Sequence, residues 1–266
     1  MQRPATGHDP VLLQEVLDAF QPAKGNVFVD CTLGRAGHAR EITSRLGPTG
    51  LLIGLDVDPN NLTFAKSQLE GAPCEVRLFH ANFAELSDVL REVEREHVDG
   101  MLADLGISTN QLFDERYGLS FAQDMPLDMR MDPRLDKTAA HFVNSMREED
   151  LANVLYELAQ ERYSRRIARK IADARRISPI NSTERLAELV RSAIPRVRAK
   201  PSSKRSGNPR ERIDPATKTF MALRMAVNRE IPNLAALLEQ APQHLNPAGR
   251  LAVISFHSTE DRLVKQ

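Results

Sequence analysis

Asp30 and Asp56 each follow a short apolar run near the N-terminus, and a turn of small residues separates them. Gly34, Ala36 and Gly37 leave room in that turn for the backbone to approach a bound molecule closely. A helix that begins at about Gly37 would present unpaired N–H groups and the positive end of its dipole to the same molecule. The spacing therefore predicts a cofactor-binding turn after a first parallel strand.

Two cofactors fit this turn, a nicotinamide dinucleotide and S-adenosylmethionine. Asp56 is placed to hydrogen-bond the ribose hydroxyls of either one. Asp30 favours S-adenosylmethionine, because a carboxylate would repel a pyrophosphate but attract a sulfonium and an amino group. A plain strand-to-helix turn that binds nothing is the remaining alternative.

The elements that must position these residues alternate between strand and helix patterns, which predicts an α/β fold with a parallel sheet covered on both faces. Asp104 ends the fourth strand, at the sheet edge where α/β enzymes carry catalytic groups. We expect strands at 27–30, 50–56, 75–80, 98–105 and 249–256, and helices at 8–17, 37–46, 59–70, 84–96, 215–230 and 232–244.

The strand pattern stops after about residue 106, and helical patterns occupy 138–195. We therefore expect a Rossmann-like domain formed by 1–109 and 216–266, with an all-helical insertion at 110–215. Residues 196–212 are rich in Arg, Lys, Ser and Pro without core-forming periodicity, which predicts a mobile basic loop. The far edge of the sheet, beyond the strand at 249–256, is expected to be missing.

Composition excludes several classes of protein. The 266 residues are 41% apolar, enough for a core, yet no run approaches the roughly 18 apolar residues of a membrane span. The N-terminus lacks the apolar segment of a signal peptide, and two cysteines are too few for a disulfide framework. No side chains have metal-ligand spacing. These features predict a cytoplasmic protein without a metal; a homodimer stays open.

Charge is distributed unevenly along the chain although its net value is zero. Residues 162–212 carry 16 Lys and Arg against four acids, a net charge of +12, and the rest of the chain carries −12. A basic block on an acidic body is typical of a nucleic-acid partner. A solvated helix face is the alternative interpretation.

The string Pro126-Leu127-Asp128-Met129-Arg130-Met131-Asp132, which no propensity argument requires, resembles the signature of the ribosomal RNA small-subunit methyltransferase H family, also called MraW. Further matching segments run in family order over nearly the whole chain: His8–Leu13, the turn 30–38, Asp214–Phe220, Ala222–Arg224 with Val227–Asn228, and Ser255–Ser258.

This resemblance implies a class I methyltransferase that transfers a methyl group from S-adenosylmethionine to the exocyclic N4 of a cytidine in 16S ribosomal RNA, at the decoding region of the small subunit. It implies that Asp56 binds the ribose diol, that Phe83 packs on the adenine and that Asp104 lies nearest the methyl-bearing end. The implied cofactor contacts are Ala36, Gly37, His38, Asp56, Phe83, Asp104 and Gln111.

Asp104 is the candidate catalytic residue, because methylation of an amine requires an acceptor for its hydrogens. A backbone carbonyl within 105–108 is the alternative acceptor. Many amino-methyltransferases carry an Asp/Asn/Ser-Pro-Pro-aromatic motif at this point, whereas this chain has Asp-Leu-Gly-Ile.

A cytidine inside folded RNA must be unstacked to reach a buried methyl donor. Aromatic residues after Asp104 could stack on it, although packing of the loop is a competing role for each. Arginines of the basic block would hold phosphates. The candidate RNA-contacting residues are Phe113, Tyr117, Phe121, Asp128, Arg130, Arg205, Arg210 and His257.

The chain departs from the family pattern at Ala36, Met125 and Thr259, where relatives usually carry Gly, Gly and Leu. Alanine at position 36 is expected to require a negative φ and to place a methyl group beside the cofactor. Two other functions stay open on sequence alone: an S-adenosylmethionine-binding ribosome-assembly factor without catalysis, and a nicotinamide-dependent oxidoreductase.

Overall fold

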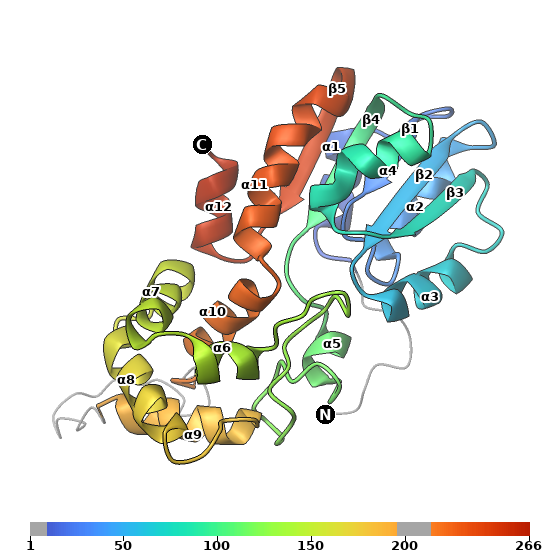
Figure 1. The fold of residues 1–266 in the computed structure, drawn as a ribbon. Coiled ribbons are helices and arrows are strands. Elements are labelled where there is room, and N and C mark those ends of the chain that lie inside the picture. The colour runs from blue at the N-terminus through green and yellow to red at the C-terminus, as the bar shows by residue number, and fades with distance from the viewer. Residues whose placement is uncertain (1–9, 196–213) are drawn as a thin grey trace, which may run out of the picture. The chain divides into compact units, whose positions relative to one another are not determined.

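The computed structural model describes residues 10–195 and 214–266, and the chain divides into two compact units (Figure 1). The first unit combines Met1–Thr109 with Glu230–Gln266, and the second is Asn110–Arg229. The chain leaves the first unit after Thr109 and returns to it at Glu230.

The first unit is built on a parallel five-stranded sheet, as predicted. Its spatial order is β3-β2-β1-β4-β5, with β5 at one edge among the described residues. Asp30 pairs with Leu102, and Asp104 pairs with Ile254, so the acidic strand ends lie at one edge of the sheet. The strands are β1 (Val27–Asp30), β2 (Leu51–Asp56), β3 (Glu75–His80), β4 (Val98–Asp104) and β5 (Leu245–Ile254).

Helices cover both faces of this sheet because alternate strand residues are apolar on both sides (Figure 1). On one face Phe28 and Leu52 pack against α1 (Leu13–Phe20), α2 (Gly37–Leu46) and α3 (Pro59–Gln68). On the other, Val29 and Ile53 belong to the core formed with α4 and α11. The elements of that face are η1 (Phe83–Glu85), α4 (Leu86–Glu92), α11 (Glu230–Gln240), η3 (Ala241–His244) and α12 (Ser258–Val264).

The second unit is helical in its described part. A short helix, α5, spans Thr109–Phe113, and a segment without regular helix precedes the bundle. Helix α10 packs against α6 and α7, so it belongs to this unit rather than to the sheet-containing one. The bundle helices are α6 (Ala139–Ser145), α7 (Glu148–Ala159), α8 (Ser164–Arg175), α9 (Thr183–Ala193) and α10 (Thr217–Val227).

Among the described residues, none of the helices has both the length and the apolar character that a membrane crossing requires. Cys31 is buried and Cys74 half-buried, and neither forms a disulfide. Burial raises the pKa of the Cys31 thiol.

Candidate cofactor and catalytic site

The turn between β1 and α2 has the tight backbone that its small residues predict. Gly34 has a φ of +52°, and its N–H donates to Asp56 Oδ2 at 2.7 Å. Ala36 is fully buried with a φ of +64° and immediately precedes α2. The expectation of a negative φ at Ala36 was therefore wrong: the chain enters α2 through a left-handed residue, at a cost of about 1–2 kcal/mol for an L-residue.

Asp56 links this turn to the loop after β2. Its Oδ1 accepts the N–H of Asp58 at 2.8 Å, and Asn61 Nδ2 lies 3.3 Å from Oδ2. Burial raises the pKa of the Asp56 carboxyl to about 6, although the N–H donors of Asp58 and Gly34 oppose the shift. Both carboxylate oxygens of Asp56 already have donors, so ribose hydroxyls would replace the longer contacts of Asn61.

Asp30 is the most deeply buried of the three acids at the ends of β1, β2 and β4, at 2% exposure. Burial raises the pKa of its carboxyl to about 7, and the charges of Asp104 and Asp56 add to the shift, while the N–H of Thr32 donates to Oδ1 and opposes it. Ionised Asp30 would be stabilised by a cationic ligand nearby, so the three acids fit a cofactor that carries a sulfonium and an ammonium group.

Asp104 ends β4 with its side chain 26% exposed. Its N–H donates to Thr32 Oγ1 at 2.6 Å, which joins the turn after β1 to the end of β4. His38 Nδ1 lies 3.9 Å from Asp104 Oδ2, while His38 Nε2 lies 2.8 Å from the carbonyl of Val11. A carbonyl only accepts, so Nε2 carries a hydrogen, and Nδ1 is the atom that faces Asp104.

The first unit thus brings together Ala36, Gly37, His38, Asp56 and Asp104 through the contacts at the ends of β1, β2 and β4. Phe83 opens η1 after β3 and is half-buried, packing against the sheet core. Gln111 is buried and belongs to the second unit.

The aromatic residues predicted to stack on a base have different environments. Phe113 is 53% exposed, whereas Tyr117 is buried. Phe121 packs edge-on against Phe220, with ring centroids 4.7 Å apart. Only Phe113 of the three presents much of its ring to solvent, and the other two pack within the second unit.

Asp128 and Arg130 form a two-pronged ion pair with each other, at 2.7 and 2.9 Å, and Arg130 also donates to the carbonyl of Leu135. This signature segment is clamped by Asn228, whose side chain donates to the carbonyl of Met129 at 2.7 Å and accepts the N–H of Met131 at 2.8 Å. The geometry supports a bracing role for these residues. Sequence reasoning assigned Asn228 no role, although it lies in a matching family segment.

Helix α8 carries several of the described basic residues of the segment 162–212. Arg165, Arg166, Arg169 and Lys170 line an open cleft that also includes Asp173 and, on α9, Ser192 and Ala193. Opposite this face, Ile167 and Ile171 are buried, so the charges form the solvent side of an amphipathic helix. Arg205 and Arg210 lie outside the described residues.

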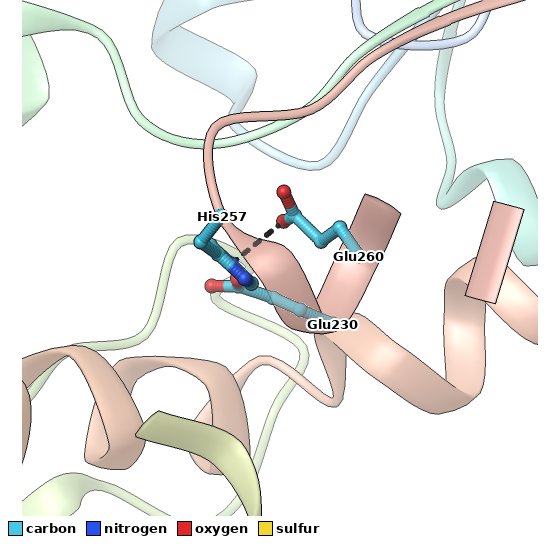
Figure 2. Close-up of side chains that lie close together, drawn as sticks. All are labelled: Glu230, His257 and Glu260. Carbon is cyan, nitrogen blue, oxygen red and sulfur yellow. Dashed lines mark ion pairs between the residues drawn. The ribbon is translucent and has the colours of Figure 1, made fainter. Parts of the chain in front are cut away.

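The loop after β5 carries two residues of interest, Phe256 and His257. Phe256 is 60% exposed, and a Cβ placed on Gly106, two residues after Asp104, would lie 3.5 Å from its ring. The side chain of His257 is 15% exposed, and Nε2 lies 3.0 Å from Glu260 Oε1 (Figure 2). Phe256 and Glu260 were not predicted as site residues; the only signal in the sequence was the family segment that contains Phe256.

The parallel sheet, its strand-end acids and the small-residue turn define a Rossmann-like class I methyltransferase fold. The family model described as the MraW methylase family matches residues 5–266, and the chain belongs to this family. The methyl donor of this class of enzyme is S-adenosylmethionine, which is the cofactor that Asp30 favoured.

Relatives cover the same span. The chain is 46% identical over 266 residues to the ribosomal RNA small subunit methyltransferase H of Syntrophotalea carbinolica, covering 100% of this chain and 82% of the relative. It is 46% identical over 258 residues to the protein of that name from Geobacter sulfurreducens, covering 97% and 80%. A solved SAM-dependent O-methyltransferase from Thermotoga maritima is 16% identical, with a TM-score of 0.32 and coverage of 40% of this chain and 38% of that one.

Proposed function

We propose that this protein methylates the exocyclic N4 of a cytidine in 16S ribosomal RNA, at the decoding region of the small subunit, with S-adenosylmethionine as the donor. The observation that carries the proposal is the group of acids at the ends of β1, β2 and β4, held around a turn whose backbone is exposed by small residues. The names of the relatives support small-subunit ribosomal RNA as the substrate.

The chemistry requires little beyond alignment and an acceptor. The cytosine N4 lone pair is delocalised into the ring, so the amine must be placed in line with an electrophilic methyl group, which bound S-adenosylmethionine supplies. Asp104 supplies a carboxylate at the end of β4, and this carboxylate can accept hydrogen bonds from the amine. His38, fixed by the carbonyl of Val11, directs Nδ1 toward Asp104 and limits the positions of that carboxylate.

Phe256 is our candidate for the contact with the flipped base. It is an exposed aromatic ring beside Gly106, in the loop that follows β5, and β5 pairs with β4 up to Asp104. Stacking of a base on such a ring is worth about 1–3 kcal/mol. Phe113 in the second unit is a further exposed ring that the RNA could use.

The cleft on α8 is our candidate for contact with RNA phosphates. Arg165, Arg166 and Lys170 form no ion pair with the residues that the structure describes, so their charges are available to a polyanion. Replacing Arg165 and Lys170 with alanine should lower affinity for the subunit and flatten its dependence on salt concentration by about 1.5 in log–log slope. Arg147→Ala, which removes a charge already paired with Asp150, is the matched control.

The decisive experiment supplies radiolabelled S-adenosylmethionine to small subunits that lack the modification and maps the methyl group by mass spectrometry. We expect one N4-methylated cytidine with the wild-type chain and a loss of at least about 100-fold in rate with Asp104→Ala. Asp88→Asn, on the exposed side of α4, is the control. Binding of cofactor and subunit without transfer would instead indicate an assembly factor, and a methyl group at another position would refute the cytidine assignment.

A further inference from the structure

Glu230, His257 and Glu260 converge at the start of two packed helices in the first unit (Figure 2). Glu230 is the first residue of α11, His257 directly precedes α12, and Glu260 lies in the first turn of α12. Their potential ligand atoms all lie within 4.8 Å of one another. No local sequence pattern indicates this cluster, because 26 residues lie between Glu230 and His257 and the packing of α11 against α12 brings them together.

Both ring nitrogens of His257 are inaccessible to solvent. Within the described residues, neither Nδ1 nor Nε2 has a hydrogen-bond partner. Nε2 lies only 3.0 Å from Glu260 Oε1, so the distance suits a hydrogen bond but the direction does not. Buried polar atoms are almost always partnered, because an unpartnered one loses its hydrogen bonds to water without replacement. The imidazole nitrogen of His257 and the carboxylate oxygen of Glu260 are instead arranged like two ligands of the same metal ion.

We propose that these three residues bind a divalent transition-metal ion of the zinc type. Ligand bonds of about 2.1 Å place two ligand atoms about 3.0–3.4 Å apart, so the pair formed by His257 and Glu260 already has the required separation. The 4.8 Å limit means that the remaining carboxylate must approach by no more than about 2 Å. One imidazole and two carboxylates suit zinc or manganese better than magnesium, which prefers oxygen ligands and retained water.

The site has a definite place in the fold. Glu260 is 2% exposed, and its Oε2 accepts the N–H of Phe256 at 3.2 Å, so one ligand is already fixed by the loop after β5. An ion here would tie that loop to the first turn of α11 and would leave coordination positions for water or a phosphate oxygen. Phe256 lies in that loop, directly after the point where β5 pairs with Asp104 of β4, so the ion would restrict the motion of the segment that carries Phe256.

The test is titration of the chelator-treated full chain with zinc sulfate, followed by calorimetry. We expect one saturable site per chain, and a loss of about 100-fold or more in zinc affinity for His257→Ala and for Glu230→Gln. His97→Gln and Glu239→Gln, both at exposed positions of the same unit, are the matched controls and should bind zinc as the wild type does. Magnesium chloride should give no comparable binding.

Two further measurements keep the result unambiguous. Glu230 is only half-buried, so Glu230→Gln tests the site even if variants at the buried Glu260 fail to fold. Cobalt(II) gives visible absorption bands that change when an imidazole ligand is lost, which reports His257 ligation directly. Absence of a saturable site, or unchanged zinc affinity in both ligand variants, would overturn the proposal and leave an ion pair. Metal stoichiometry is measured without RNA, so this outcome is independent of methyl transfer.

Discussion

Asp30→Asn should stabilise the cofactor-free protein, and by an amount that depends on pH. Burial raises the pKa of the Asp30 carboxyl from 3.8 to about 7, with a contribution from the charges of Asp104 and Asp56. A pKa change of about three corresponds to about 4 kcal/mol at 1.36 kcal/mol per unit, which is an upper estimate of the cost of ionising Asp30 in the folded state. Asparagine removes this charge and can still accept the N–H of Thr32.

The direction of the pH dependence follows from proton binding. Because the folded pKa of Asp30 lies above the unfolded one, the folded state binds more protons between about pH 4 and pH 7, and the free energy of unfolding falls as the pH rises through that window. Asp30→Asn should therefore match the wild type near pH 4. Near pH 8 it should be more stable by up to about 4 kcal/mol, or roughly 8 °C in melting temperature for a chain of this size.

The affinity for S-adenosylmethionine should change with pH in the opposite direction to the free energy of unfolding. S-adenosylmethionine carries a net positive charge and favours ionised Asp30, so its binding should release a proton below about pH 7. Its affinity should then rise with pH by up to about tenfold per unit in that range. S-adenosylhomocysteine lacks the sulfonium charge and should show a shallower rise. Asp30→Asn should weaken S-adenosylmethionine by about tenfold or more at pH 8 and the homocysteine analogue less.

Thermal unfolding and calorimetry between pH 4 and pH 8 measure both effects, with Asp88→Asn as the surface control because that side chain is 73% exposed. Equal stabilisation by Asp30→Asn at pH 4 and pH 8 would refute the reasoning, because a charge effect must vanish once the carboxyl is protonated. Loss of stability at pH 8 would show that hydrogen bonding outweighs burial of the charge.

Three other substitutions test separate features. Ala36→Gly should raise the free energy of unfolding by about 0.5–1 kcal/mol, because glycine relieves the strain of a left-handed alanine but adds conformational freedom to the unfolded chain. If chemical denaturation shows no increase in this free energy, the strain inferred from the φ of +64° is contradicted. Asn228→Ala should cost about 2–4 kcal/mol by leaving the backbone groups of Met129 and Met131 unpartnered, against a small effect of the exposed Asn181→Ala. Phe256→Ala should lower kcat/KM for subunits about tenfold or more without changing the affinity for S-adenosylmethionine, whereas Phe256→Tyr should keep its activity. Equal losses of kcat/KM in the Tyr and Ala variants would exclude stacking.

Much of the sheet was predictable from local patterns. The predicted strands at 27–30 and 75–80 coincide with β1, a short and mostly buried apolar run, and with β3, in which polar and apolar residues alternate. The start of β5 was missed, since Asn246 and Pro247 interrupt the apolar pattern where its register against β4 shifts. The periodicity of α10 predicts a helix, but it does not indicate that this helix packs on α6 and α7.

Part of the candidate site could also be predicted from local patterns. The positions of Asp56 and Asp104 at strand ends follow from the apolar run before each of them, and the turn follows from its small residues. Three other contacts join residues 27 to 99 positions apart, which no local pattern encodes: the hydrogen bond from Asp104 N–H to Thr32, the hydrogen bonds of Asn228 to the signature segment, and the approach of Glu230 to His257. The left-handed Ala36 is a local feature, but it contradicts the preference of its own residue type.

The distribution of charge limits how RNA can reach the site. The segment 162–212 carries +12 and the remainder −12, and the acids at the strand ends belong to that remainder. Carboxylates attract a cationic cofactor but repel phosphates, so the part of the RNA that enters should be a neutral base and its backbone should be held elsewhere. The exposed ring of Phe256 can meet a neutral base, and the cleft on α8 can hold phosphates. Added salt should therefore weaken subunit binding strongly, yet change cofactor affinity much less, because a buried site is poorly screened.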